Sequence, residues 1–143
     1  MQAASDGQTE SKGTILCADD DGAVLATLDA LLTASGYRTI LAHDGDEAIA
    51  LFKKHQQDLL AVVLDLRMPK KDGIEVARQI RAESAEIPLL ALSAYLVGSQ
   101  VKEVLRQCAE GGFDACTRKP FGTASFLKTL DDCIGRHARK GQA

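Results

Sequence analysis

The run Leu60-Ala61-Val62-Val63-Leu64 is purely apolar and ends at a carboxylate, Asp65. A short apolar run followed by turn residues is typical of a central strand of a parallel sheet, which is buried on both faces. In open parallel sheets, ligands bind in the crevice beyond the carboxyl ends of the strands. Asp65 is therefore predicted to lie at the mouth of a binding site, although an aspartate that only opens a turn has the same local pattern.

The alternation of strand and helix recurs along the chain on both sides of this run. The predicted strands are Thr14–Ala18, Tyr37–Ala42, Leu59–Leu64, Leu89–Leu92 and Ala115–Arg118. Helical spacing of apolar residues predicts helices from Val24 to Gly36, from Gly45 to Lys54, from Asp72 or Gly73 onward, from Val97 or Gly98 to Glu110, and from Thr123 to about Arg136. This order predicts an α/β fold: a doubly wound, five-stranded parallel sheet with helices on both faces and the flavodoxin-like order 2-1-3-4-5.

The composition is that of one globular domain. Of the 143 residues, 45% are hydrophobic and 26% are charged, and the formal net charge is -3. This balance argues against direct binding of nucleic acid, and no apolar stretch approaches the roughly 20 residues of a membrane span. We expect a cytoplasmic protein with a disordered leader at 1–12, a folded domain at 13–137 and a tail at 138–143. The four cysteines lack metal-binding spacing and are expected to be free thiols.

Polar side chains stand at the ends of four predicted strands. Asp19 and Asp20 follow the first strand, Asp65 the third, Ser93 the fourth and Lys119 the fifth. Taken singly, each has an ordinary explanation as a helix cap, a turn residue or a surface charge. Together, three carboxylates at one edge would repel one another, and a divalent cation relieves that repulsion. Hard oxygen ligands favour Mg²⁺ over zinc, and a cation beside Lys119 provides a place for a phosphoryl group.

This constellation resembles the receiver domain of two-component response regulators over almost all of Thr14 to Arg136. The matching motifs are Asp19-Asp20, Asp65 with Met68-Pro69 and Asp72-Gly73 after it, Ser93-Ala94, and Lys119-Pro120-Phe121. The resemblance implies that Asp65 is the phosphoacceptor. It also implies that Asp19, Asp20 and Asp65 hold Mg²⁺ together with the backbone carbonyl of Arg67.

The resemblance also implies how the phosphoryl group is bound. Ser93 would hydrogen-bond it together with the backbone of Ala94, and Lys119 would pair with its charge. The bond from Lys119 to Pro120 would be cis, which proline permits at low cost.

Three positions are expected to modify this behaviour. Many receivers have an aromatic residue three positions before the lysine, where this chain has Cys116, so the usual coupling of hydroxyl and aromatic residue is altered. Arg67 and Tyr95 stand two places after the phosphoacceptor and the hydroxyl residue, where their bulk would hinder an attacking water. We therefore expect slow loss of the phosphoryl group.

The implied function is that of a signalling phosphoacceptor rather than an enzyme acting on other substrates. A histidine kinase or a histidine phosphotransfer protein would phosphorylate the domain, which would then change how it binds a downstream protein. The chain would be a stand-alone regulator or the receiver of a hybrid kinase. A phosphatase of the haloacid dehalogenase type would need an acid where Arg67 stands. The alternative is a pseudo-receiver, a protein-interaction module that phosphorylation does not regulate.

Overall fold

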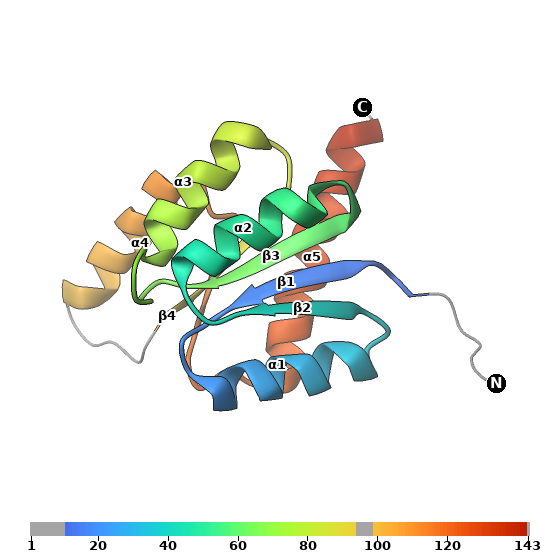
Figure 1. The fold of residues 1–143 in the computed structure, drawn as a ribbon, viewed down its shortest axis with the longest axis horizontal. Coiled ribbons are helices and arrows are strands. Elements are labelled where there is room, and N and C mark those ends of the chain that lie inside the picture. The colour runs from blue at the N-terminus through green and yellow to red at the C-terminus, as the bar shows by residue number, and fades with distance from the viewer. Residues whose placement is uncertain (1–10, 94–98, 143) are drawn as a thin grey trace.

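The structure, a computed structural model, describes the backbone of residues 11–93 and 99–142 and the side chains of 11–93 and 100–136. In this part of the chain, five parallel strands form one sheet in the order β2-β1-β3-β4-β5, with helices on both faces (Figure 1). The strands are β1 (Thr14–Ala18), β2 (Arg38–Ala42), β3 (Leu59–Asp65), β4 (Leu89–Ser93) and β5 (Ala115–Arg118). The helices are α1 (Gly22–Ala34), α2 (Gly45–His55), α3 (Gly73–Glu83), α4 (Ser99–Gly111) and α5 (Thr123–Gln142), with a short 3-10 turn η2 (Gln56–Asp58). The predicted fold class and strand order are confirmed.

Two apolar layers, one on each face of the sheet, hold the domain together. Neighbouring side chains of a strand point to opposite faces, so Ile15 and Cys17 of β1 pack on one side and Leu16 and Ala18 on the other. Helices α1 and α5 cover the first layer, and α2 and α3 cover the second (Figure 1). Burial on both faces explains why the run Leu60–Leu64 contains no polar residue.

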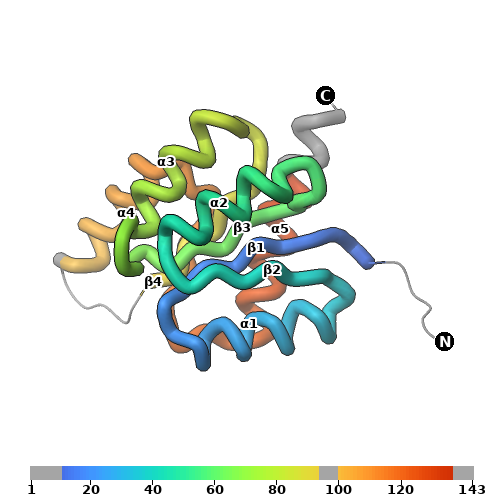
Figure 2. The backbone as a smooth tube through the Cα atoms, viewed as in Figure 1, coloured from blue at the N-terminus to red at the C-terminus, as the bar shows by residue number. Residues whose placement is uncertain are grey.

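The strand register places the predicted polar residues at one edge. Ala18 pairs with Leu64, and Asp65 pairs with Leu92, so β1, β3 and β4 end close to the same level. The backbone N–H of Lys119 donates to the carbonyl of Ser93 over 2.7 Å, which ties the end of β5 to the end of β4. The chain leaves β1 and β3 in opposite directions, toward α1 and α3 (Figure 2). This is the position where ligands bind in doubly wound folds.

Gly73 allows helix α3 to begin directly against the end of β3. A Cβ atom at this position would lie 2.3 Å from the backbone oxygen of Asp65. The preceding residue, Asp72, caps the helix by accepting a hydrogen bond from the N–H of Glu75 over 2.9 Å. The pair Asp72-Gly73 therefore fixes how closely α3 approaches the loop that follows Asp65.

The structure differs from the sequence prediction at the end of the last helix. Helix α5 continues to Gln142 instead of ending near Arg136, so the backbone of 138–142 is helical. Ala138, Arg139 and Lys140 have high helix propensity, which explains the extension. At the other end of the domain, the N–H of Lys12 donates to the carbonyl of Gly36 over 2.8 Å, and β1 begins at Thr14. Residues 1–10 of the predicted leader lie outside the described residues.

Candidate functional site

Three carboxylates meet where β1 and β3 end. One oxygen each from Asp19, Asp20 and Asp65 lies within 4.8 Å of the others. Asp19 is fully buried, Asp65 is nearly so, and Asp20 is exposed. The N–H of Asp21 donates to Oδ1 of Asp19 over 2.9 Å, which fixes the orientation of that carboxylate. These clustered hard oxygen donors, two of them screened from water, fit a divalent cation such as Mg²⁺.

Lys119 reaches this cluster from the end of β5. Its Nζ lies 2.9 Å from Oδ2 of Asp19 and 3.5 Å from Oδ2 of Asp65. Burial lowers the pKa of Lys119, but the hydrogen bond with Asp19 and the charges of both carboxylates raise it by more, so the net shift is upward. The side chain is therefore a fixed ammonium that touches two of the three acids.

The carboxyl group of Asp65 has a raised pKa. Burial and the charge of Asp19 raise the pKa of Asp65 to about 6, although the charge of Lys119 and the N–H of Arg67 act in the opposite direction. A bound cation would favour the ionised form, because it attracts the carboxylate that Asp19 repels. The site is therefore suited to a divalent ion even though Lys119 already neutralises part of its charge.

A cavity of about 360 Å³ opens beside Asp65, and Ser93 lines it from the end of β4. Ser93 is buried, and its Oγ lies 3.7 Å from Sγ of Cys116 on β5. Lys119 and Asp20 line the same cavity, so a hydroxyl, an ammonium and two of the three acids face one space. The volume is sufficient for a phosphoryl-sized group with surrounding water.

Helices α3 and α4 contribute cavity residues to which the sequence prediction assigned no site role. Asp72 and Ile74 line the cavity from the start of α3, and Val104 and Gln107 line it from α4. Asp72 is recognisable as part of the Asp72-Gly73 motif, but its carboxylate is already used as the cap of α3. No sequence pattern predicts that Gln107 lines the cavity, because its position near the strand ends depends on how α4 packs against α3.

The remaining predicted site residues are only partly placed. Arg67 lines the cavity with an exposed side chain, and its N–H lies 3.4 Å from Oδ1 of Asp65. The bond between Lys119 and Pro120 is cis. Ala94 and Tyr95 lie outside the described residues, so the expectations that concern them stay predictions. Cys116 lies beside Ser93 and is half-buried.

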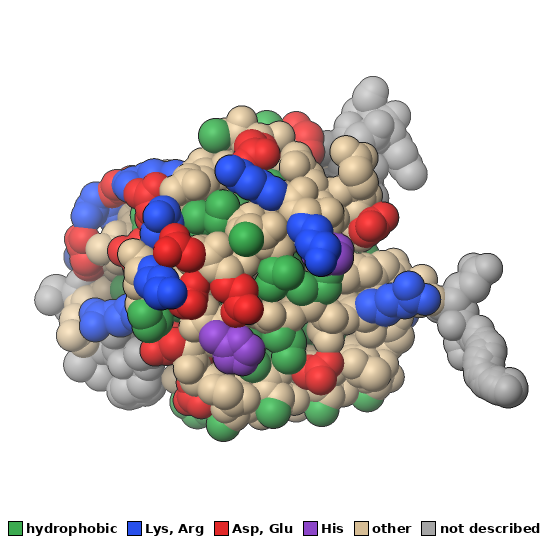
Figure 3. Space-filling model, in the orientation of Figure 1, with side chains coloured by type: hydrophobic (Ala, Val, Ile, Leu, Met, Phe, Trp, Pro, Cys, Tyr) green, Lys and Arg blue, Asp and Glu red, His purple; other side chains and the backbone are tan. Residues whose placement is uncertain are grey.

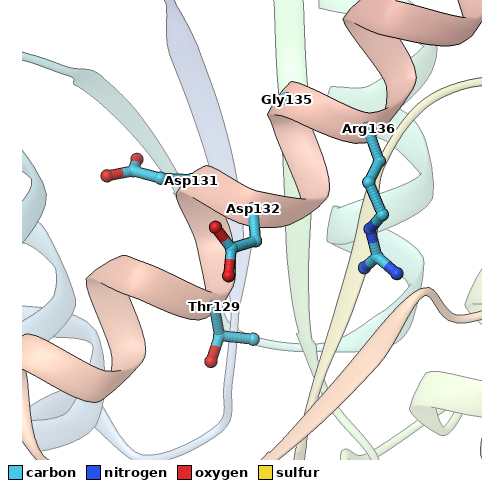
Figure 4. A pocket seen from close by; sticks show the side chains of 5 residues that line it. All are labelled: Thr129, Asp131, Asp132, Gly135 and Arg136. Atoms are coloured by element: carbon cyan, nitrogen blue, oxygen red, sulfur yellow. The ribbon is translucent and has the colours of Figure 1, made fainter.

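The surface away from this edge shows no comparable cluster among the described side chains. Acidic and basic side chains are interspersed over α2 and α3 in the space-filling view (Figure 3). One such ion pair joins Asp46 of α2 to Lys71, which precedes α3, over 3.1 Å. A hollow of about 390 Å³ on α5 is lined by Thr129, Asp131, Asp132, Gly135 and Arg136 (Figure 4). It contains none of the strand-end residues and is a groove along a single helix. None of the described helices is long and apolar enough to span a membrane.

Sequence comparison identifies relatives over most of the chain. The response regulator receiver domain family matches residues 15–131. Response regulator MprA of Mycobacterium ulcerans (strain Agy99) is 45% identical over 122 residues, which are 85% of this chain and 50% of that protein. The protein of the same name from Mycobacterium sp. (strain KMS) is 46% identical over the same length. The chain thus spans about half the length of the curated relatives it matches.

Solved structures agree with this assignment. The receiver domain of sensor histidine kinase PA1611 from Pseudomonas aeruginosa, which has a magnesium ion coordinated in its active site cleft, superposes with a TM-score of 0.73 at 28% identity, covering 86% of this chain and 98% of that one. A receiver domain protein from Clostridium thermocellum shares the fold with a TM-score of 0.77 at 22% identity, over 87% and 95% of the two chains. The chain therefore belongs to the response regulator receiver domain family, the phosphoacceptor domains of two-component signal transduction.

Proposed function

We propose that Asp65 accepts a phosphoryl group in the presence of Mg²⁺, from a histidine kinase or a histidine phosphotransfer protein, and that this changes a protein-binding surface of the domain. A single observation supports this assignment. The carboxylates of Asp20 and Asp65, the ammonium of Lys119 and the hydroxyl of Ser93 line one cavity, and the buried carboxylate of Asp19 contacts Lys119. Each of these groups has a use in phosphoryl transfer to a carboxylate.

The residues that would hold Mg²⁺ are Asp19, Asp20 and Asp65, with the backbone carbonyl of Arg67. When bound, the ion would supply positive charge to the oxygens of the transferring group. A magnesium ion is described in the active site cleft of the related PA1611 receiver, which supports the choice of metal. The buried carboxylate of Asp19 would then exchange part of its pairing with Lys119 for the metal.

The transfer step requires little covalent machinery from the protein. An oxygen of Asp65 attacks the phosphorus of a phosphohistidine; the new P–O bond forms as the P–N bond breaks, and the imidazole leaves with the electron pair and takes up a proton. Lys119 Nζ, 3.5 Å from Oδ2 of Asp65, is close enough to pair with an oxygen of the transferring group. The role of these residues is thus to position the acceptor and to balance its charge.

The change of surface would begin at Ser93. A phosphoryl group brings about -1.5 to -2 charges and new hydrogen-bond acceptors to Asp65. Oγ of Ser93 now accepts from Sγ of Cys116 over 3.7 Å, and a turn of Ser93 toward the phosphoryl group would break this contact. Because Cys116 belongs to β5 and packs with α4, that movement would loosen the contact between these two elements.

Incubation of the full chain with acetyl phosphate tests the proposal. With Mg²⁺ we expect the intact mass to rise by one phosphoryl group, and with a chelator we expect no change. Asp65→Asn should abolish the gain. Asp58→Asn, which replaces an exposed carboxylate just before the opposite end of β3, should not affect the mass gain.

A pseudo-receiver would give a different result. The wild type would then remain unmodified at saturating acetyl phosphate and Mg²⁺, and beryllofluoride would leave the backbone amide spectrum from Ser93 to Cys116 unchanged. Either result would overturn the role of Asp65 as a regulated phosphoacceptor.

A further inference from the structure

Two cysteines lie together between α4 and β5, next to the hydroxyl of Ser93. Cys108 is buried on α4, and Cys116 on β5 packs against the same small apolar cluster. The two thiols are close enough to interact electrostatically, and Sγ of Cys116 lies 3.7 Å from Oγ of Ser93. Neither thiol has a part in phosphoryl transfer, so this pair is not explained by the proposed function.

The surroundings of the pair favour reaction at Cys116. Its hydrogen bond with Cys108 is the main cause that lowers the pKa of Cys116 to about 6, and Ser93 and the positive charge of Arg118 act in the same direction against burial. The pKa of Cys108, the donor, is raised. Cys116, Arg118 and Leu105 line a surface groove of about 300 Å³, and Leu105 is 56% exposed. A thiolate near a positive charge with access from solvent is the usual setting of a reactive cysteine.

We propose that Cys116 and Cys108 form a peroxide-sensitive thiol pair that closes into an intramolecular disulfide. The thiolate of Cys116 attacks one oxygen of hydrogen peroxide; an S–O bond forms, the O–O bond breaks, and the departing hydroxide takes a proton to become water. The sulfur of Cys108 then attacks the sulfenic acid; the S–S bond forms, the S–O bond breaks, and the hydroxide leaves with the Cys108 proton as a second water. Two thiols lose two electrons and one peroxide is reduced to two waters.

The disulfide would connect the receiver to the redox state of its surroundings. It joins α4 covalently to β5 and removes the thiol that now contacts Ser93. If Ser93 moves on phosphorylation, which rests on the proposed function, the oxidised domain would resist the accompanying shift of β5 against α4. Formation of the disulfide itself does not depend on Asp65.

Peptide mapping of the intact wild-type chain tests the pair directly. After treatment with hydrogen peroxide and blocking of the remaining thiols, we expect a non-reduced peptide that joins Cys108 to Cys116 and disappears on reduction. Before oxidation, iodoacetamide should label Cys116 at least about 10-fold faster than Cys17 and Cys133, which are buried thiols with raised pKa values. Equal labelling of all four cysteines, or a disulfide only between two chains, would overturn the proposal.

Variants separate this proposal from the function of Asp65. In the Cys108→Ser variant, oxidation of Cys116 should stop at the sulfenic acid, which dimedone traps. The Cys133→Ser variant should still form the disulfide. The Asp65→Asn variant should also form the disulfide. A failure of phosphorylation at Asp65 would therefore not affect the test of the thiol pair. In the wild type, the oxidised form should show smaller beryllofluoride-induced amide shifts in β5 and α4 than the reduced form. Equal shifts would show that the disulfide does not act on the switch.

Discussion

Asp65 is subject to opposing electrostatic effects. Burial and the charge of Asp19 favour its neutral form, while Lys119 and the N–H of Arg67 favour the carboxylate, and the resulting pKa is about 6. A carboxyl group whose pKa is higher in the folded than in the unfolded chain binds its proton more tightly when folded. Its contribution to stability is therefore present below the unfolded pKa and is lost as the pH rises through 6. At neutral pH, the burial of Asp65 beside Asp19 destabilises the metal-free domain, and the same cluster of carboxylates favours a bound cation.

Substitution of Asp65 by asparagine should stabilise the metal-free domain. At pH 8 in a chelator we expect the free energy of unfolding of Asp65→Asn to be about 1–3 kcal/mol higher than that of the wild type, because the asparagine carries no charge that burial penalises and Asp19 repels. The difference should shrink as the pH falls below 6, where Asp65 becomes protonated in the folded chain, and it should vanish only below 3.8, where the unfolded chain is protonated as well. Urea unfolding at several pH values measures this. A wild type that is the more stable form at pH 8 would contradict the electrostatic account.

Lys119 is expected to matter more for phosphorylation than for metal binding. Lys119→Ala removes the ammonium that lies 2.9 Å from Asp19 and leaves the three oxygen ligands in place. We expect Mg²⁺ to bind at least as tightly, since a competing positive charge is gone, while acetyl phosphate modifies the protein at least about 10-fold more slowly. Isothermal titration measures the Mg²⁺ affinity, and intact mass followed over time measures the rate of phosphorylation. Lys128→Ala, an exposed lysine on α5, is the control and should change neither.

At the scale of the element, the approach of α3 to β3 depends on one glycine. The backbone of Gly73 lies so close to the carbonyl of Asp65 that a methyl group would overlap with it. Gly22 holds the corresponding first position of α1, and a methyl group there would meet no other described part of the protein within 4 Å. The two glycines therefore form a matched pair, one packed and one free.

Alanine substitution should separate these two glycines. Gly73→Ala should destabilise the domain by about 1–3 kcal/mol and weaken Mg²⁺ binding, because the loop from Asp65 to Asp72 must move to make room. Gly22→Ala should raise stability by about 0.4–1 kcal/mol, since alanine loses less backbone entropy in a helix. Thermal unfolding and magnesium titration of both variants provide the comparison. If both substitutions change stability and Mg²⁺ affinity by the same amounts, the overlap of a methyl group at position 73 with the backbone of Asp65 is relieved without loss of stability.

At the scale of the whole molecule, the sheet joins residues that are far apart in the chain. Asp19 and Lys119 are separated by 100 positions and lie in contact. A cation bound to Asp19, Asp20 and Asp65 would therefore connect the end of β1 to the end of β3 and would bind only the folded chain.

Magnesium should accordingly stabilise the entire domain. At a free concentration 100 times its dissociation constant, Mg²⁺ should raise the free energy of unfolding by about 2.7 kcal/mol, and a chelator should reverse this. Asp20→Asn, which changes the exposed carboxylate of the cluster, should reduce the effect, whereas Asp58→Asn should retain it. Thermal unfolding over a range of Mg²⁺ concentrations measures the shift. A midpoint that does not depend on Mg²⁺ in the wild type would contradict metal binding at this cluster.

Local sequence patterns were sufficient to predict the strands, the helices and the polar residues at the strand ends. Strands buried on both faces must be apolar throughout, so β1, β3 and β4 are recognisable from short runs of residues. Alternation of strand and helix, with right-handed connections, then limits the strand order to a few possibilities. Asp19, Asp20, Asp65, Ser93 and Lys119 could be selected because each follows a predicted strand.

Only the tertiary structure decided how these residues differ and which others join them. Asp19 is buried and Asp20 is exposed although they are neighbours in sequence, because successive side chains leave the strand end in different directions. The elevated pKa of Asp65, the contact of Cys116 with Ser93 and the position of Gln107 at the cavity all result from packing between separate elements. A sequence pattern reports which face of its own helix or strand a residue occupies. It carries no information about the atoms that another element places opposite, and these atoms set both charge and reactivity.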